Sequence, residues 1–436
     1  ILQQIGGDEV AKAKDMNVMS SLAGKVAGVN INASSSGIGG GARVVMRGTK
    51  SISGNNNALY VVDGVPLANI SGEQPDDQYT GAGQSGDGLA NFNADDIESI
   101  SVLSGSAAAA LYGSAAANGV VLITTKKGVV DKTRLTYSNN STFYSPFRLP
   151  EFQNTYGSET GEWYSWASKL SSPTDYEVKD FFQTGYNVAN TVSLTTGTQK
   201  NQTYVSVGAV NARGIIQNND LDRYNFSVRN TTSMLNDKLT MDLSFMYSNV
   251  KEQNMLSQGE YANPLVPVYL FPRGDDFSKY QYYERYDVDR NIKTQFWPLK
   301  ENGLSMQNPY WIAYRNVRTN EKKRYMLNAG LTYDILDWLN VSARIRVDNT
   351  DNTYQQKLYA STISTLTEGS TQGHYTIQKV NETQTYADFM VNINKRIDDF
   401  TVVVNAGTSL SDNSSDLLGY GGPIRDTGVP NVFNVF

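Results

Sequence analysis

The stretch LTMDLSFMYS, residues 239–248, alternates apolar and polar side chains along its length. One row is apolar or aromatic and contains Leu239, Met241, Leu243, Phe245 and Tyr247. The other row is mostly polar and contains Thr240, Asp242, Ser244, Met246 and Ser248. This period of two predicts a β-strand with unlike faces. In a soluble sandwich the apolar row would point into a core, whereas in a membrane barrel it would point into lipid and the polar row would line a watery lumen.

Similar alternating segments recur after residue 128. Each is about ten residues long, which is the length at which a tilted strand crosses a bilayer. We expect nine such strands, at 133–142, 190–198, 203–211, 222–234, 238–249, 323–335, 338–350, 384–397 and 400–410.

The connections between these segments alternate between short and long. The short ones include LND at 235–237, LDW at 336–338 and DD at 398–399, and the long ones include 143–189, 250–322 and 351–383. Strict alternation places every tight turn at one end of the strands and every long loop at the other. This arrangement is typical of outer-membrane barrels with long extracellular loops.

Arg and Asp recur on the polar row, which points inward in a closed barrel. Unpaired charges in a core would cost several kcal/mol each, whereas a hydrated lumen removes that cost. We therefore expect Leu243, Phe245, Leu331 and Ile345 to face lipid. The lumen-facing side chains would be Asp242, Asn328, Arg344 and Arg346.

Composition excludes several classes of function. The 436-residue chain has a net charge of −6 and no block of Lys and Arg, which argues against a nucleic-acid partner. No run of about 18 apolar residues occurs, so a helical membrane protein is excluded. Zero cysteines and a single histidine, His374, leave no thiolate or multi-histidine metal site, and we expect neither a metal nor a cofactor. His374 is interpreted as a solvated loop residue.

The first 128 residues lack bilayer-length alternation and predict a compact α+β domain. Asp63-Gly64 lies between two β-rich runs and indicates a type I′ hairpin. Asn93 is expected to cap a short helix, with Asp95 and Asp96 in its first turn. We interpret these two, with Glu98, as helix-start charges and not as an acid–base pair.

Glycines are frequent at 34–48, but they do not indicate a nucleotide site. The following residues, Val44 to Met46, predict a strand where a phosphate-binding loop requires a helix.

Several motifs of this chain resemble those of TonB-dependent outer-membrane transporters, specifically the SusC/RagA branch of Bacteroidota. They are SLAGKVAGV (21–29), MRG (46–48), NNNALYVVDGVP (55–66), DDIESISVLSGSAAAALYGSAAANGVVLITTKKG (95–128), YVSVGAVNARGII (204–216) and NPYW (308–311). Within the first four, the matching positions that we single out are Arg47, Gly48, Tyr60, Asp63, Gly64, Pro66, Asp96, Glu98, Tyr112, Gly113, Asn118 and Gly119.

The resemblance implies a plug domain at 1–128 and the N-terminal part of a transmembrane β-barrel at 129–436, in the outer membrane of a Gram-negative bacterium. Barrels of this family have 22 strands, so about nine strands imply an incomplete chain that also lacks the N-terminal part of the plug. We expect the plug to occupy the lumen and to meet Asp242, Arg344 and Arg346 through hydrated polar contacts.

The function implied by the resemblance is active, TonB-dependent import of an oligomeric nutrient, a glycan or an oligopeptide. A SusD-like lipoprotein would form a lid, and two transporter–lid pairs would form a dimer. The alternatives are a passive porin or a surface adhesin, although neither explains a plug. An enzyme is not expected, because no catalytic set is present.

Two groups of residues are candidates for ligand contact. A polar segment at 70–88 contains Asp76, Asp77, Gln78, Tyr79 and Asp87, which would either reach the binding cavity or form a solvated plug loop. Four tryptophans in the predicted long loops would either stack on sugar rings or pack among the loops, namely Trp163, Trp166, Trp297 and Trp311.

Overall fold

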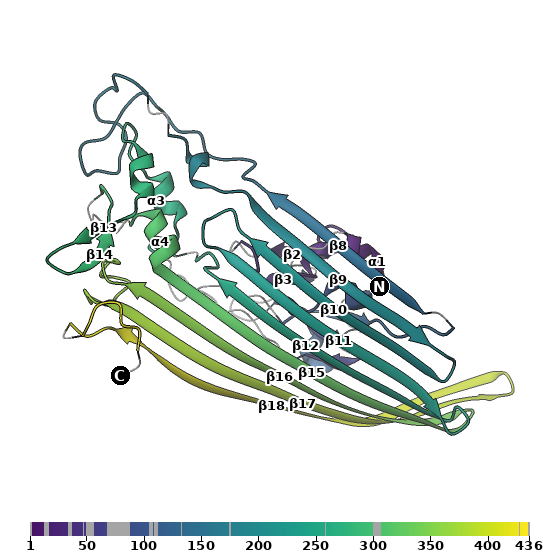
Figure 1. Cartoon of the computed structure of the whole chain (residues 1–436). Coiled ribbons are helices and arrows are strands. Elements are labelled where there is room, and N and C mark those ends of the chain that lie inside the picture. The colour runs from purple at the N-terminus through teal and green to yellow at the C-terminus, as the bar shows by residue number, and fades with distance from the viewer. Residues whose placement is uncertain are drawn as a thin grey trace.

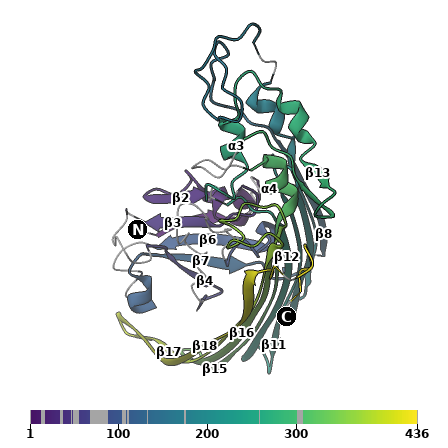
Figure 2. The same ribbon diagram turned by 90° about the vertical axis from the view of Figure 1, so that its left-hand side faces the viewer.

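The computed structural model describes residues 2–12, 17–33, 37–46, 48, 56–67, 88–103, 108, 112–131, 133–173, 176–257, 259–299, 307–426 and 428–434. Two sheets account for most of these residues. A small mixed sheet lies on the concave side of a large curved antiparallel sheet (Figure 2). Among the described residues, no helix combines the length and the apolar character needed to cross a bilayer.

The small sheet has five strands in the order β1-β6-β7-β4-β5. They are β1 (Leu2–Gly6), β4 (Leu59–Val62), β5 (Val65–Pro66), β6 (Ile97–Leu103) and β7 (Val120–Thr125). Only β4 and β7 run parallel; the other pairs are antiparallel. A second hairpin joins β2 (Val29–Ala33) to β3 (Ala42–Met46).

Short helices complete this domain, and they are α1 (Gly7–Lys12), η1 (Ser20–Leu22), η2 (Ala94–Asp96) and η3 (Gly113–Ala116). The core between them is apolar and includes Val62, Ile100, Val121 and Ile123.

Local signals in this domain are confirmed. Asp63 and Gly64 have φ angles of 50° and 82°, as a type I′ turn requires. The Asn93 side chain accepts a hydrogen bond from the Asp95 amide and caps η2. The glycine-rich segment leads into strand β3, so its described part has no helix that could hold a phosphate.

The large sheet has nine antiparallel strands, and each pairs with the next along the chain (Figure 1). They are β8 (Arg134–Tyr144), β9 (Gly185–Gly197), β10 (Asn201–Arg213), β11 (Asp220–Met234), β12 (Leu239–Gln253), β15 (Asn316–Leu336), β16 (Leu339–Tyr359), β17 (Gly373–Ile397) and β18 (Phe400–Pro423). All nine predicted strands are present, and the predicted fold class is confirmed. Closure into 22 strands stays a prediction.

The large nine-stranded sheet is called the wall from here on, and the predicted orientation of its two faces is also confirmed. Leu243, Leu331 and Ile345 are 38%, 47% and 49% exposed on the convex face. The alternate side chains, including Arg344 and Arg346, point to the small sheet on the concave face. The apolar row therefore faces away from the domain that fills the concave side.

The connections sort to the two ends of the strands, as predicted. Tight turns follow β9, β11, β15 and β17 at one end, because the antiparallel registers continue almost to each turn. The opposite end carries a lobe built from the long connections, which is seen at the upper left of Figure 1. The lobe contains η4 (Val178–Phe181), α3 (Leu265–Tyr269), η5 (Phe277–Gln281), β13 (Glu284–Asp287), β14 (Ile292–Gln295) and α4 (Pro309–Arg315).

His374 is not a solvated loop residue, so that prediction is wrong. Strand β17 begins at Gly373, and the His374 side chain is buried with its Nε2 3.3 Å from Glu368 Oε1. The strand continues past the apolar band as a polar strand, and such a segment carries no alternating signal in the sequence.

Candidate functional site

The Asp63-Gly64 hairpin of the small sheet is held by three arginines of the wall. Arg229 comes from β11, and Arg344 and Arg346 come from β16. All three point to the concave face: Arg344 and Arg346 occupy alternate positions of β16, and Arg229 lies in the same cross-strand row as Arg346, with β12 and β15 between them. The hairpin therefore meets a row of guanidinium groups.

Two of these arginines bind the backbone of the hairpin. Arg346 donates from Nη2 to the Val62 carbonyl at 2.6 Å and from Nη1 to the Val65 carbonyl at 3.1 Å. Arg344 Nη1 donates to the Asp63 carbonyl at 3.2 Å. The planar guanidinium fork suits this task, because it presents several donors in fixed directions.

Arg229 binds the hairpin through the Asp63 side chain. Its Nη1 lies 3.1 Å from Asp63 Oδ1, while its Nε and Nη2 donate to the two carboxylate oxygens of Asp242 at 2.9 and 2.7 Å. Lys127 Nζ lies 3.1 Å from the same Asp242 carboxylate. Charge-assisted contacts thus join the hairpin, the wall and the segment that leads to β8.

The wall neutralises its own arginines in part. Asp388 of β17 accepts from Arg344 Nη2 at 2.6 Å. Arg346 Nε instead donates to the amide oxygen of Asn328, and no carboxylate among the described residues forms an ion pair with it. Since the Arg346 side chain is only 1% exposed, the hairpin carbonyls supply much of its solvation.

Two separate features of this site require glycine at position 64. Its φ of 82° favours glycine, and a Cβ atom there would lie 2.5 Å from Arg344 Nη1. The Asp63-Gly64 pair therefore satisfies the turn and the approach of the wall together.

A second contact centres on Asp96. Its carboxylate accepts hydroxyl hydrogen bonds from Tyr204 at 2.9 Å, Ser206 at 2.6 Å and Ser227 at 2.8 Å. Burial raises the pKa of Asp96, and the three hydroxyl donors oppose that shift. Asp95 and Asp96 lie in the first turn of η2, as predicted, whereas Glu98 lies on strand β6 and is not a helix-start charge. The Asp96 side chain has a further role that the sequence did not indicate, because it anchors η2 to β10 and β11.

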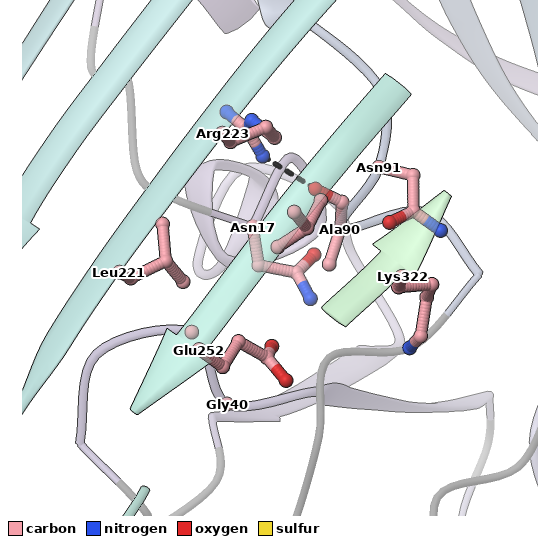
Figure 3. Close-up of a pocket in the computed structure, with 10 residues that line it drawn as sticks. Asn17, Gly40, Ala90, Asn91, Leu221, Arg223, Glu252 and Lys322 are labelled. Atoms are coloured by element: carbon pink, nitrogen blue, oxygen red, sulfur yellow. Dashed lines mark hydrogen bonds between the residues drawn. The ribbon is translucent and has the colours of Figure 1, made fainter. Parts of the chain in front are cut away.

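A third contact lies nearer the lobe, where residues 88–92 meet the wall. Arg223 donates to the Ala90 carbonyl, Asn225 Nδ2 donates to the Asn91 carbonyl at 2.7 Å, and Arg324 Nη1 donates to the Gly88 carbonyl at 2.5 Å. Figure 3 shows the cavity beside Arg223 and Ala90, which measures about 10 Å³. This volume has room for about one water molecule.

These contacts correct one expectation. The sequence predicts hydrated contacts between the N-terminal domain and Arg344 and Arg346, but the guanidinium groups bind the hairpin carbonyls directly. The interface is therefore closer than a water-mediated one.

The other motif positions have structural roles or lie outside the description. Tyr60 packs against the core of the small sheet, Tyr112 packs on a second apolar cluster, and Glu98 is exposed on β6. A Cβ atom at Gly119 would lie 2.3 Å from Met46 Sδ. Pro66 ends β5, Gly48 and Gly113 have positive φ angles, Asn118 lies in the turn before β7, and Arg47 lies outside the described residues.

The candidate ligand residues are not brought together. Asp76, Asp77, Gln78, Tyr79 and Asp87 all lie outside the described residues. Trp311 is fully buried on α4, and its Nε1 donates to Thr362 Oγ1 at 3.0 Å. Trp297 packs in the aromatic core of the lobe beside Phe271.

Trp163 and Trp166 form an edge-to-face pair at 6.4 Å, and Trp166 is 71% exposed. Trp166 is therefore the exposed member of this group, whereas Trp163 and Trp297 are half-buried. Throughout the described ranges, no group of three or more His, Cys, Asp or Glu residues is placed to hold a metal ion.

An N-terminal domain bound to the polar face of an antiparallel barrel wall defines a plugged outer-membrane receptor. Residues 1–120 match the family described as the TonB-dependent Receptor Plug Domain. The chain belongs to the TonB-dependent receptors, and it is similar in sequence to a receptor of the SusC type. These receptors reside in the outer membrane of Gram-negative bacteria and are not enzymes.

Among curated relatives, the TonB-dependent receptor SusC of Bacteroides thetaiotaomicron is 30% identical over 317 residues, which cover 69% of this chain and 30% of SusC. The TonB-dependent receptor P26 of Formosa agariphila is 28% identical and is covered to 27% of its length. The matched part of this chain therefore spans less than a third of the length of these relatives.

Solved structures show the same fold. A chain of the RagAB peptide transporter superposes with a TM-score of 0.72 at 17% identity, covering 100% of this chain and 50% of that one. The ferric citrate transporter FecA in its unliganded form has a TM-score of 0.57 at 12% identity, covering 98% of this chain and 49% of that one.

Proposed function

We propose that this chain forms the plug, residues 1–128, and the N-terminal part of the barrel wall, residues 129–436, of an active importer. The cargo is an oligomeric nutrient, a glycan or an oligopeptide. TonB acts on the plug from the periplasm, and a SusD-like lipoprotein covers the extracellular side, where the long connections lie. Two transporter–lid pairs form the dimer.

The observation that carries this proposal is the seating of the plug. Its hairpin and η2 bind the wall through hydrogen bonds and ion pairs. Smaller apolar contacts lie beside them, from the plug core to Met246 and Met326 and from Ile38 to a cluster of wall residues. Polar contacts of this kind can exchange with water when the plug moves, at a lower cost than an apolar core. A closed but releasable plug suits active import.

Similarity supports the class of cargo without deciding between its members. One solved relative is named a peptide importer, whereas SusC is named only as a receptor. In this chain Trp163 and Trp166 are the candidates for contact with a sugar ring or an apolar peptide side chain. Asp76, Asp77, Gln78, Tyr79 and Asp87 are proposed to face the cargo from the plug.

A passive porin or an adhesin is the alternative. Neither requires a domain clamped across the lumen, because a porin conducts through an open channel and an adhesin acts through its loops. The two classes differ in whether plug movement is needed.

A reversible cross-link between plug and wall tests this difference. Asn93 Nδ2 lies 3.2 Å from Thr191 Oγ1, and the 436-residue chain has no cysteine, so Asn93→Cys with Thr191→Cys introduces one pair of thiols across this contact for an oxidative cross-link. The matched control is Thr133→Cys with Thr196→Cys, which joins hydroxyl positions 2.8 Å apart within the wall and leaves the plug free.

Growth of the host on a panel of purified oligosaccharides and oligopeptides is the readout. The oxidised plug–wall variant should fail to grow on the polymer on which a strain lacking the gene also fails to grow. A reductant should restore growth of the variant. The wall pair should grow normally. Normal growth of the oxidised plug–wall variant would show that uptake needs no movement at this contact and would favour a passive protein.

A further inference from the structure

The connection between β8 and β9 carries three neighbouring aromatic side chains, Trp163, Tyr164 and Trp166. This connection lies at the outer end of the lobe in Figure 1 and leans to the concave side of the wall in Figure 2. Trp166 is 71% exposed, whereas Trp311 is fully buried and Trp297 packs against the aromatic core of the lobe. The lobe thus has an aromatic core that could take up the Trp166 ring, yet that ring stays in solvent.

Hydrogen bonds fix the residue that lies between Tyr164 and Trp166. Gln153 Nε2 donates to the Ser165 carbonyl at 2.6 Å, and the Arg273 backbone amide donates to Ser165 Oγ at 3.0 Å. Gln153 Oε1 also accepts hydrogen bonds from two backbone amides close to it, each at 2.8 Å. Ser165 is therefore held at its carbonyl and at its hydroxyl, so a ligand need not order the rings on either side of it.

The three rings form a stack with a border. Tyr164 and Trp166 stack with their centroids 5.4 Å apart and their planes 23° from parallel. Trp163 stands almost perpendicular to Trp166, at 80° and 6.4 Å. The face of an aromatic ring is the negative part of its quadrupole, and it attracts the weakly positive C–H groups on the face of a sugar ring. One sugar ring can lie on the Trp166 indole with Trp163 beside it.

Two carboxylates lie next to these rings. Desolvation and the neighbouring carboxylates of Glu159 and Glu162 raise the pKa of the Tyr164 hydroxyl, which places both carboxylates beside the stack. An ionised carboxylate only accepts hydrogen bonds, and a sugar hydroxyl can donate them. The stack and the carboxylates together therefore offer an apolar face and polar acceptors, which are the two kinds of contact that a sugar ring makes.

The charge around the rings favours a neutral sugar. Residues 151–170 contain three carboxylates, from Glu151 and the two glutamates beside the rings, and one cation, Lys169. The nearby Arg273 guanidinium is buried over the Phe152 ring and is not presented to solvent. An anionic sugar such as a uronate would meet net repulsion here, whereas a neutral sugar would not.

An oligopeptide fits this place less well. A bound peptide commonly pairs its backbone with a free strand edge. Here the two chain segments below the rings already pair with each other, from the Gly157 amide to the Ser168 carbonyl at 3.0 Å and from the Leu170 amide to the Thr155 carbonyl at 2.9 Å. A folded protein partner is also disfavoured, since one indole face is far smaller than the about 800 Å² that each partner contributes to a stable interface.

We propose that Trp166 binds one neutral sugar ring of an oligosaccharide, with Trp163 at its side and Glu159 and Glu162 accepting hydrogen bonds from its hydroxyls. Tyr164 supports the indole from its other face, and Gln153 is a positioning residue that holds the turn. This inference rests on the proposed function and deepens it, because it names the cargo as a neutral glycan and not an oligopeptide.

Binding of sugars by the whole purified protein tests the site. The probes are a printed array of gluco-, manno-, galacto- and xylo-oligosaccharides, with hexagalacturonate and a mixture of oligopeptides for comparison. The wild type should bind at least one neutral series. Trp166→Ala should weaken that binding by about tenfold, and Trp166→Phe should keep most of it, because a phenyl ring still stacks. Tyr282→Ala is the matched control, since it removes another exposed ring of the lobe and should bind as the wild type does.

Two further variants separate charge and positioning from stacking. Glu159→Gln with Glu162→Gln keeps oxygen acceptors and removes the negative charge, so it should retain part of the binding to the neutral sugar and should also admit hexagalacturonate, which the wild type excludes. Gln153→Ala leaves every ring in place in the sequence but frees Ser165, so it should weaken sugar binding while the fluorescence of Trp166 shows a more mobile indole.

Equal affinity of the wild type and Trp166→Ala for the sugar would overturn the proposal, as would a wild type that binds none of the neutral oligosaccharides. A lid protein that is lost from Trp166→Ala while sugar binding is unchanged would assign the rings to a protein partner and would also overturn it. The cross-link test of import is scored separately. Growth on an oligopeptide that requires release of the plug would leave active import standing and would remove only the assignment to a neutral glycan.

Discussion

Arg346 and Val62 lie 284 positions apart in the chain, and Arg346 Nη2 donates a 2.6 Å hydrogen bond to the Val62 carbonyl. The contact joins the middle of a membrane strand to the edge of the plug sheet. Arg346 is buried, so both the cation and the carbonyl depend on this pairing for their solvation. The fit between wall and plug at this point holds the Asp63-Gly64 hairpin in place.

Replacing Arg346 with Met should loosen the hairpin without unfolding the wall. The change leaves the carbonyls of Val62 and Val65 without their donor, at about 1–3 kcal/mol for each unsatisfied group. Deuterium exchange of residues 59–66 should rise, while exchange in β15 and β16 stays slow. Lys323→Met is the matched control, because Lys323 is half exposed on the convex face. Unchanged deuterium exchange at residues 59–66 in Arg346→Met would contradict the claim that Arg346 holds the hairpin.

Comparing Gly64→Ala with Gly28→Ala separates the backbone cost of the turn from the steric contact with Arg344. Both glycines have strongly positive φ angles, 82° and 74°, so both substitutions carry a backbone cost of about 1–2 kcal/mol. A Cβ atom at Gly64 meets Arg344, whereas at Gly28 nothing lies within 4 Å. The temperature of thermal unfolding should therefore fall further in Gly64→Ala than in Gly28→Ala. Equal losses would mean that Arg344 does not constrain the hairpin.

Leu243→Arg and Asp242→Asn test the two faces of one strand. Leu243 lies midway between Leu239 and Tyr247, so an arginine there should cost about 2–4 kcal/mol of barrel stability. Asp242→Asn should cost the wall far less, and its main effect should appear at the plug, because Arg229 and Lys127 lose a shared carboxylate. Urea unfolding in lipid vesicles provides the comparison, and similar losses for the two variants would reverse the assigned orientation.

The β13–β14 hairpin of the lobe should loosen in acid. Burial alone would raise the pKa of Glu284, but hydrogen bonds from Lys293 and Arg315 outweigh it and lower that pKa below the ordinary value of 4.5. A carboxylate with a lowered pKa contributes stability above its unfolded value and loses it as the pH falls through the folded value. Protection factors of residues 284–295 should therefore fall below pH 4.5.

The matched variant for that titration is Glu284→Gln, which keeps an acceptor but cannot titrate. Its hairpin should be less protected at neutral pH and should show no acid transition of its own. An identical acid transition in the wild type and in Glu284→Gln would assign the change to another group.

The sequence predicts the wall better than the contact with the plug. Alternation identifies all nine strands, and the lumen row can be read from Asp242, Arg344 and Arg346 because charges on that row exclude a dry core. The Asp63-Gly64 turn can also be predicted from the sequence, because its positive φ angles favour these residue types.

Partners distant in the sequence could not be predicted in the same way. Asp96 meets Ser206 and Ser227 from positions 110 and 131 residues away, and nothing local distinguishes it from a helix-start charge. The upper part of β17 was also missed, since a strand that is polar on both faces has no period-two signal. The one feature of the sequence that indicates the contact with the hairpin is the pair of arginines, Arg344 and Arg346, at alternate positions of one strand.

The central claim is that residues 1–128 close the lumen. Conductance across a planar bilayer tests it most directly, with the whole protein compared with the same protein lacking residues 1–128. The intact protein should be closed, and the folded, plug-deleted barrel should conduct as an open pore without TonB. Plug-deleted barrels that are folded and yet conduct no more than the intact protein would contradict the claim.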